Sequence, residues 1–203
     1  MAIVKMASKE RIQRLKDENR INILDAAHQI VREEGWPALS MRKIADVIEY
    51  TAPVIYEYFE NKEALILELT RKGFLILARQ MAEAKSKHKA PAKQLEAMWL
   101  AYWNFAFAEK ELYQVMFGVG ANCCEMAKIL PESEQYADLV YDVIEQMMPK
   151  GATEDEVCIK YYTFWSVIHG LISINLVNKG RSTEMNDQVL KIAISGIIRS
   201  ICD

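Results

Sequence analysis

Apolar residues recur at helical spacing along most of the chain, and breaks in this pattern separate about nine predicted helices. In the first, about residues 16–34, Ile23, Ala27 and Ile30 lie on one face. Gly35 and Pro37 follow it and end it, because proline cannot continue a helix. The other helices are predicted at about residues 41–49, 52–58, 62–87, 92–108, 110–117, 132–148, 154–177 and 184–201. No segment has a convincing strand pattern, so the predicted class is all-α.

Residues that cap helices support these boundaries. Ser40, Thr51 and Asn61 each precede a predicted helix and can accept a hydrogen bond from its free N–H groups. Thr153 and Glu156 have the spacing of a capping box, which indicates where the longest apolar helix begins.

Composition agrees with a folded helical protein. The 203 residues are 51% hydrophobic and 26% charged, and the chain contains only 8 glycines and 5 prolines. The net charge is −3, but basic residues are concentrated in residues 1–20 and 71–93, whereas residues 21–62 are net acidic. The first basic segment is compatible with phosphate contacts. We interpret the second as a solvated helix end and linker.

Membrane insertion and secretion are not expected. The most apolar stretch, residues 161–178, contains His169 and Asn175 as well as hydroxyl side chains, which favours a buried helix. Residues 1–17 lack a long apolar region, so no secretory signal is predicted and a cytoplasmic location is expected.

Residues that could carry catalysis or bind a metal are dispersed. Four cysteines, Cys123, Cys124, Cys158 and Cys202, show no zinc or redox spacing. Reduced thiols are the favoured interpretation, and an oxidation sensor built on the vicinal pair is the alternative. The three histidines also lack ligand spacing, and no nucleophile–base pair or glycine-rich phosphate loop is present. We therefore expect no enzymatic activity, no metal and no cofactor.

The segment from Ser40 to Lys62 has the strongest functional pattern. Two short predicted helices flank a break of about three residues, and a third helix starts just after them. This is the spacing of a helix-turn-helix, in which the second helix enters the major groove of DNA. Short helical hairpins are also common outside DNA-binding proteins, so spacing alone leaves both interpretations open.

Residues 35–69 resemble the TetR (tetracycline-repressor-like) family. The similarity lies in Gly35, in residues 39–45 (LSMRKIA), in residues 53–56 (PVIY), in Tyr58-Phe59 and in residues 61–65 (NKEAL). Residues 165–170 (WSVIHG) are similar to the "WHG" C-terminal domain of some members. The resemblance implies DNA binding by residues 1–62, a ligand-binding and dimerisation domain in residues 63–203, and a connecting helix over residues 62–87.

Within this resemblance, the candidate DNA-binding residues have plausible chemistry. Lys62 at a helix start, the hydroxyls of Ser40 and Thr51, and the phenols of Tyr56 and Tyr58 suit phosphates. Arg42 can read a guanine edge, and the apolar surface of Ala52, Pro53 and Val54 suits thymine methyl groups. The alternatives are core packing for the two tyrosines and simple solvation for the two cations. Two residues depart from the family pattern: Glu49 stands where glycine is usual in the turn, and Ala52 where lysine or glutamine is frequent.

The resemblance further implies a homodimer formed by the last two helices, and a pocket for an effector. A stripe of small and apolar residues suits close helix contact: Val189, Ile192, Ala193, Gly196, Ile197 and Ser200. Candidate pocket residues are mostly aromatic, with ordinary core packing as the alternative for each: Trp99, Tyr102, Trp103, Met116, Phe117, Tyr162, Trp165 and His169.

The predicted function is a ligand-responsive transcriptional regulator. It would bind a pseudo-palindromic operator in double-stranded DNA as a dimer and be released by a small, mostly apolar effector. Repression is the family default, and the residues do not specify the sign of regulation, the effector or the operator. An enzyme and a helical interaction protein that has lost DNA binding are the alternatives.

Overall fold

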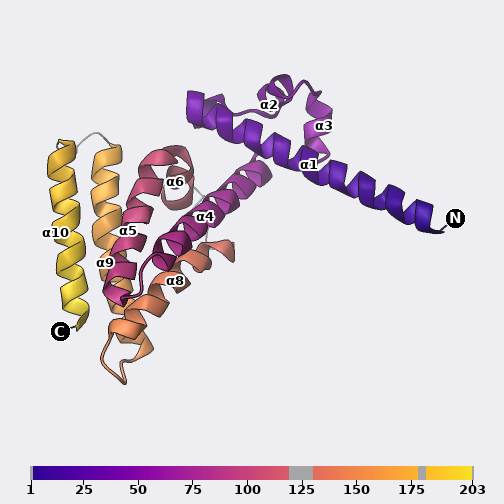
Figure 1. Cartoon of the computed structure of the whole chain (residues 1–203). Helices are drawn as coiled ribbons and strands as arrows, with labels where there is room; N and C mark the ends of the chain where they lie inside the picture. The colour runs from indigo at the N-terminus through magenta and orange to yellow at the C-terminus, as the bar shows by residue number, and fades with distance from the viewer. Residues whose placement is uncertain (1, 119–129, 178–181, 203) are drawn as a thin grey trace. The chain divides into compact units, whose positions relative to one another are not determined.

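The structure, a computed structural model, describes residues 2–118, 130–177 and 182–202. These residues form nine α-helices and one short 3-10 helix, and they contain no strand (Figure 1). The prediction of an all-α protein with about nine helices is therefore confirmed for the described part of the chain. Cys123 and Cys124 lie outside the described residues.

The helices near the N-terminus follow the predicted boundaries except at the start of the first. They are α1 (Ala2–Glu34), η1 (Trp36–Ala38), α2 (Met41–Val47), α3 (Ala52–Tyr56) and α4 (Lys62–Ser86). The predicted start of α1 near Lys16 was wrong by about fourteen residues. The periodic apolar face that guided the prediction begins only at Ile23, and the preceding turns bury no described side chain.

The remaining helices begin and end within two residues of their predicted limits. They are α5 (Pro91–Ala108), α6 (Lys110–Phe117), α8 (Glu132–Met147), α9 (Glu154–Leu176) and α10 (Thr183–Cys202). The capping box at the start of α9 is present: the Thr153 hydroxyl accepts from the Glu156 N–H, and the Glu156 carboxylate accepts from the Thr153 N–H.

The chain divides into two compact units, Met1–Thr70 and Arg71–Asp203, here called the N-terminal and C-terminal units. The N-terminal unit has a small core between α1, α2 and α3, in which Ile23, Ile44 and Ile55 are fully buried. This core fixes how α2 and α3 lie against each other, because both helices bury their apolar side on it.

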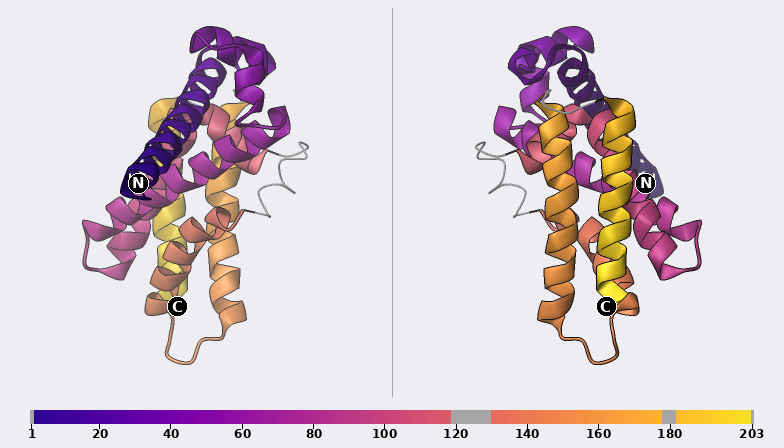
Figure 2. Two further views of the ribbon diagram at one scale, coloured as in Figure 1. Left: turned by 90° about the vertical axis from the view of Figure 1, so that its right-hand side faces the viewer. Right: turned by 90° about the vertical axis from the view of Figure 1, so that its left-hand side faces the viewer.

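The C-terminal unit is built around α5, which contacts α6, α8, α9 and α10. Its inner residues Trp99, Tyr102 and Phe105 are fully buried, and the Trp99 ring stacks on Phe164 of α9 at a centroid distance of 4.8 Å. Helices α9 and α10 lie side by side at one face of the unit (Figure 2). The buried face of α5 thus forms the centre of a core shared by these five helices.

Within the described part of the chain, one helix, α9, is long and apolar enough to cross a membrane by length and composition. Its buried residues recur at helical spacing and face the core of the C-terminal unit: Val157, Tyr161, Phe164, Ile168 and Ile172. A core helix with one buried face passes the same length and composition test.

Candidate functional site

The helix-turn-helix candidate consists of α2, the turn that follows it, and α3. The Ser40 hydroxyl oxygen caps α2 by accepting from the Lys43 N–H at 3.1 Å. Thr51 occupies the equivalent position before α3, but its side chain makes no capping hydrogen bond. The predicted capping role of Ser40 is therefore confirmed. Thr51 is the N-cap residue by position, but the predicted capping hydrogen bond of its side chain is absent.

Glu49 lies in the turn between α2 and α3 and has a φ angle of 57°. It is the one non-glycine residue with positive φ in the described part of the chain. The turn therefore keeps the left-handed conformation for which glycine is suited, at a cost of about 1 kcal/mol for a residue with a Cβ atom.

The candidate DNA-binding residues form an accessible surface on the N-terminal unit. Tyr56 is 54% exposed, so its ring is not part of the core. Ser40, Arg42, Thr51 and Pro53 are also exposed, whereas the remaining candidates are half-buried: Ala52, Val54, Tyr58 and Lys62. The α2–α3 surface, defined by these nine residues, presents hydroxyls, two cations and small apolar groups from neighbouring elements.

Lys62 is the first residue of α4, and its neighbour Asn61 caps that helix. The Asn61 side-chain oxygen accepts from the Ala64 N–H at 2.7 Å. The N-terminus of a helix combines free N–H groups with the positive end of the helix dipole, so the Lys62 ammonium adds to a local field that favours an anion.

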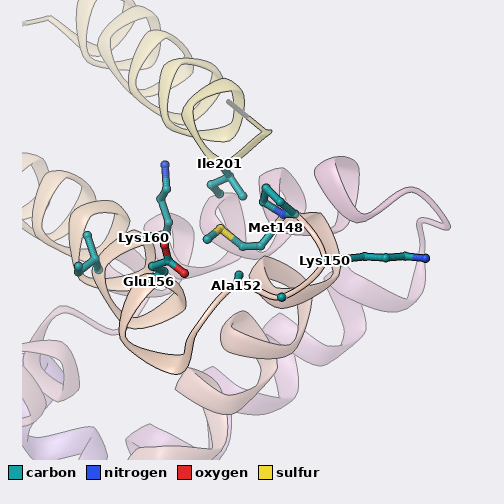
Figure 3. A pocket seen from close by; sticks show the side chains of 9 residues that line it. Met148, Lys150, Ala152, Glu156, Lys160 and Ile201 are labelled. Atoms are coloured by element: carbon teal, nitrogen blue, oxygen red, sulfur yellow. The ribbon is translucent and has the colours of Figure 1, made fainter.

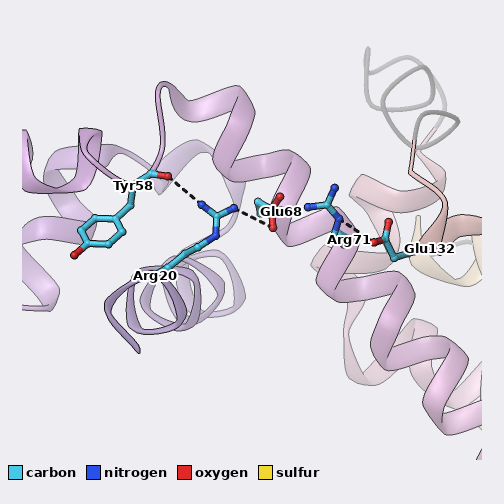
Figure 4. Close-up of polar contacts among 5 residues, drawn as sticks. All are labelled: Arg20, Tyr58, Glu68, Arg71 and Glu132. Carbon is cyan, nitrogen blue, oxygen red and sulfur yellow. Dashed lines mark hydrogen bonds and ion pairs between the residues drawn. The ribbon is translucent and has the colours of Figure 1, made fainter. Parts of the chain in front are cut away.

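Arg20 on α1 holds the end of this surface in place. Its guanidinium donates to the Tyr58 carbonyl at 3.1 Å and pairs with Glu68 of α4 at 3.2 Å (Figure 4). The guanidinium also lies 4.5 Å from the Phe59 ring centroid. Asn19 supports the same corner by donating to the Tyr58 hydroxyl at 3.0 Å. Sequence reasoning missed the roles of both residues, because the sequence around a polar residue on an amphipathic helix does not indicate which distant residue it contacts.

The C-terminal unit contains a cavity of about 350 Å³. Four of the predicted pocket residues line it, namely Met116, Phe117, Tyr162 and Trp165. Tyr161 of α9 also lines the cavity, and sequence reasoning missed the remaining lining residues, which lie on α4 and α8: Phe74, Ser133, Glu134, Tyr136, Ala137 and Tyr141. The helical period of α8 was a usable signal, because Ser133, Tyr136, Ala137 and Tyr141 recur at helical spacing on one side of it.

The other predicted pocket residues lie outside the lining. Trp99 and Tyr102 are fully buried, and Trp103 packs against Phe107 at 4.8 Å between centroids. His169 faces Tyr113, and the Tyr113 hydroxyl is hydrogen-bonded to the His169 Nδ1 atom. Tyr102 and His169 belong to a polar chain that reaches the cavity wall at Trp165.

That polar chain joins α5, α6 and α9. Trp165, which lines the cavity, donates its indole N–H to the Tyr102 hydroxyl at 3.1 Å, and Tyr102 lies 3.2 Å from the Tyr113 hydroxyl. Burial raises the pKa of Tyr113, so this side chain remains a phenol that can donate to His169. Burial lowers the pKa of His169 below 6.5, which favours the neutral imidazole that can accept.

The face formed by α9 and α10 carries the predicted dimer residues. Val189, Ser200 and Ile192 are exposed, the last by 70%, whereas Ala193, Gly196 and Ile197 are half-buried. Further exposed apolar residues extend this α9–α10 face: Ile159, Tyr162, Val167, Ile174, Val177 and Met185. A Cβ atom added at Gly170 or Gly196 would meet nothing within 4 Å, so both glycines leave space outside the chain.

A second hollow, of about 410 Å³, lies where the α8–α9 connection meets the end of α10 (Figure 3). Lys160 of α9 donates to the Ser200 carbonyl of α10, and Glu156 is engaged in the capping box. The backbone N–H of Thr153 lowers the pKa of Glu156. The polar groups of this hollow therefore join helices, and we assign it no ligand.

No group of three or more metal-binding side chains occurs among the residues that the structure describes. Cys158 is a free thiol, and its sulfur accepts from the Tyr141 hydroxyl at 3.4 Å.

Family comparison agrees with this geometry. Residues 23–69 match the family described as bacterial regulatory proteins, tetR family, and residues 95–196 match the tetracyclin repressor-like C-terminal domain. The second match alone covers half of the chain, and the chain belongs to the TetR family of transcriptional regulators, as predicted. This places it among DNA-binding regulators rather than enzymes.

Two curated relatives differ in the sign of regulation. The chain is 20% identical over 199 residues to the HTH-type transcriptional repressor NicS of Pseudomonas putida, covering 90% of this chain and 94% of NicS. It is 25% identical over 133 residues to the HTH-type transcriptional activator FasR of Mycolicibacterium smegmatis, covering 64% of this chain and 61% of FasR.

Solved structures share the fold. FadR from Bacillus subtilis, solved in complex with stearoyl-CoA, has a TM-score of 0.68 at 16% identity, covering 87% of this chain and 98% of FadR. A TetR family transcription regulator from Marinobacter aquaeolei has a TM-score of 0.62 at 19% identity, covering 90% and 97% of the two chains.

Proposed function

We propose that the chain is a cytoplasmic homodimeric repressor that binds a pseudo-palindromic operator and is released by a small, mostly apolar effector. Residues 1–62 would bind DNA, residues 63–203 would bind the effector and the second copy, and α4 would connect the two functions. The accessible α2–α3 surface, with Lys62 at a helix N-terminus, carries the DNA-binding part of this proposal.

The cavity supports an apolar effector. Seven of its eleven lining residues are aromatic, and the described lining contains one charged side chain, the carboxylate of Glu134. An uncharged planar molecule would stack on such walls without a desolvation penalty for unpaired charge. Acyl-CoA, the ligand of FadR in its solved complex, carries phosphates for which this described lining has no cationic partner.

The α9–α10 face supports a homodimer. Exposed apolar residues cover two adjacent helices, and the open space at Gly170 and Gly196 permits close approach of another helix. A dimer would also place two copies of α3 on consecutive half-sites, which is why a pseudo-palindromic operator follows.

The mechanism would be a shift between two conformations of different DNA affinity. Phe74 of α4 lines the cavity, and α4 is one continuous helix from Lys62 to Ser86. Lys62 lies about 18 Å along the helix from Phe74, by the rise of 1.5 Å per residue. An effector that displaces Phe74 would move α4 and thereby favour the conformation with weaker DNA binding.

Two finer assignments belong to this proposal. Repression is supported by the similarity to NicS, which extends over 90% of this chain. A WHG-type C-terminal domain is supported by the residues WSVIHG at 165–170. Of these, Trp165 lines the cavity, His169 ends the polar chain, and Gly170 lies on the α9–α10 face.

Mutations on the α2–α3 surface test the DNA-binding part. We expect Lys62→Ala to weaken binding to every duplex about equally, because a phosphate contact carries no sequence information. Arg42→Ala should also reduce the preference for the selected operator, by about 1–3 kcal/mol at the base pair it reads. Fluorescence anisotropy with duplexes from the region upstream of the protein's own coding sequence provides the measurement.

Lys110→Ala is the matched control, since it removes an exposed cation of the C-terminal unit. Equally poor binding by the wild type and all three variants at low salt would refute operator binding. A broad effector screen in which no compound changes DNA binding would refute the ligand response.

A further inference from the structure

The first turns of α1 extend beyond the core of the N-terminal unit. Helix α1 begins at Ala2 (Figure 1). Its first described buried residue is Ile23, and every residue from Lys9 to Glu18 is exposed. We call residues 2–16 the α1 arm. At a rise of 1.5 Å per residue, it is about 22 Å long.

The arm buries no described apolar side chain against the rest of the chain. Ile12 and Leu15 are 53% and 49% exposed. A helical segment of this length is only marginally stable by itself in water, and most helices in proteins are stabilised by packing. The arm is therefore the kind of element that gains stability from a partner outside the chain.

The charge of the arm indicates the chemistry of that partner. The arm contains five basic residues and a single acidic one: Lys5, Lys9, Arg11, Arg14 and Lys16 against Glu10. Among the described residues, no carboxylate forms an ion pair with Lys9, Arg11, Arg14 or Lys16. Repulsion among these cations is relieved by a surface with regularly spaced negative charges, such as the phosphates of DNA.

The root of the arm is attached to the two turns that flank α3. The Asn19 amide donates to the Tyr58 hydroxyl at 3.0 Å, and the Tyr50 hydroxyl donates to the Asn19 side-chain oxygen at 3.1 Å. Arg20 adds its hydrogen bond to the Tyr58 carbonyl. Because α1 is continuous through these residues, the position of the arm is coupled to the α2–α3 surface within the same unit.

We propose that the α1 arm is a second DNA-binding element, which lies along the duplex outside the half-site contacted by α3 and binds its phosphates. This inference rests on the proposed operator binding and extends it. An arm of about 22 Å spans about six base pairs at 3.4 Å per base pair. Phosphate contacts add affinity without base preference, so the arm lengthens the footprint and leaves the recognised sequence unchanged.

The test compares a neutral arm with a matched control. In the arm variant Lys9→Gln, Arg11→Gln, Arg14→Gln and Lys16→Gln are combined, which keeps good helix formers in the arm. The control combines Lys87→Gln, Lys89→Gln, Lys93→Gln and Lys110→Gln, which removes the same charge from exposed positions of the C-terminal unit. The probes are an operator core, selected by the wild-type protein from random duplexes, with and without ten flanking base pairs on each side.

We expect the arm variant to bind the flanked duplex at least tenfold more weakly than the wild type at 100 mM salt. Loss of four phosphate contacts should also reduce the slope of log K against log salt by about 3.6 per arm. Binding to the core without flanks should be unchanged, as should the order of preference among mutated cores. The control variant should bind both duplexes like the wild type.

Equal affinity of the arm variant and the wild type for the flanked duplex would overturn the proposal, and so would the same loss on both duplexes. A smaller molar mass of the arm variant in light scattering would assign the arm to contacts between copies instead. Circular dichroism spectra and melting temperatures of both variants verify folding. If the wild type selects no duplex at all, operator binding itself fails, which is a different outcome from the loss of flank dependence.

Discussion

At the scale of single residues, Glu49 is a strained position in the turn of the helix-turn-helix. Its φ of 57° is sterically costly for a residue with a Cβ atom. We expect Glu49→Gly to raise the free energy of unfolding of the N-terminal unit by about 1 kcal/mol, measured by urea denaturation. Asp46→Gly, in the neighbouring helix α2, should instead lower it by about 0.5–1 kcal/mol. A destabilised Glu49→Gly variant would show that the glutamate has compensating contacts.

His169 gives a second prediction at this scale, concerning pH. Burial lowers its pKa below the value of 6.5 expected for the unfolded chain, so between these two values the unfolded state binds more protons. Above pH 6.5 the titration of His169 does not reduce the free energy of unfolding. As the pH falls below 6.5, the free energy of unfolding decreases, because protons bind more strongly to the unfolded chain. We therefore expect the melting temperature to fall between pH 7.5 and pH 5.5.

The variant His169→Gln isolates this contribution, because the glutamine oxygen can still accept from Tyr113 but does not titrate. Its melting temperature should decrease less over the same pH interval, measured by differential scanning calorimetry. An identical decrease in the variant and the wild type would assign the pH dependence to other groups.

At the scale of helices, α9 and α10 have two different faces. Leu190, Ile194 and Ile201 of α10 are buried in the C-terminal unit, whereas Val189 and Ile192 are exposed. The period of the helix therefore separates a face that packs within the chain from a face that is available to a second copy. This arrangement explains why a single helix can show apolar residues on more than one side.

Ile192→Glu tests the exposed face, because an unpaired carboxylate at the centre of a packed interface is strongly unfavourable. We expect this variant to be monomeric at micromolar concentration in size-exclusion chromatography with light scattering, with its helix content retained. Leu75→Glu, at an exposed position on α4, should leave the molar mass unchanged. A dimeric Ile192→Glu variant would place the interface elsewhere.

At the scale of the whole molecule, we expect α4 to couple the two proposed activities, because it is one helix from Lys62 to Ser86. Its N-terminus carries Lys62, and Phe74 stacks on Tyr136 of α8 at a centroid distance of 6.0 Å in the cavity wall. A Cβ atom at Gly73 would lie 2.5 Å from the Met116 sulfur, so α4 and α6 are in close contact beside the cavity. Movement of either helix requires the other to adjust.

Phe74→Leu tests this coupling. We expect DNA affinity without effector to stay within about threefold of the wild type, because the substitution is apolar and costs about 1 kcal/mol of stability. The concentration of a screened effector needed for half release should rise at least about fivefold, which corresponds to about 1 kcal/mol of coupling. Leu75→Ala, its exposed neighbour, is the control. Unchanged release by Phe74→Leu in anisotropy titrations would contradict a role for α4.

Much of the architecture could be predicted because local signals sufficed. The Ser40 and Asn61 caps, the Thr153–Glu156 capping box and the apolar period define most helix boundaries through interactions between residues three or four apart. The beginning of α1 was missed because its described residues from Lys9 to Glu18 are all exposed, so no packed face creates a pattern there.

The lining of the cavity could not be deduced from the sequence in the same way. Of the residues named as pocket candidates, Met116, Phe117, Tyr162 and Trp165 line this cavity. Aromatic character alone did not distinguish Trp99, which is fully buried in the core, from Tyr136, which lines the cavity. The packing of α5, α8 and α9 decides which aromatic rings are buried in the core and which line the cavity. The spacing of residues along any one helix does not encode this packing.

The sequence by itself therefore determined the class, the helices and the family, because periodicity, capping and a short motif act over a few residues. Only the tertiary structure decided which residues meet across long separations. It places Arg20 against Tyr58 and Glu68, Phe74 of α4 in the cavity wall, and His169 at the end of a polar chain from Trp165. These contacts join residues 38 to 63 positions apart, and their geometry depends on the packing of whole helices rather than on local preference.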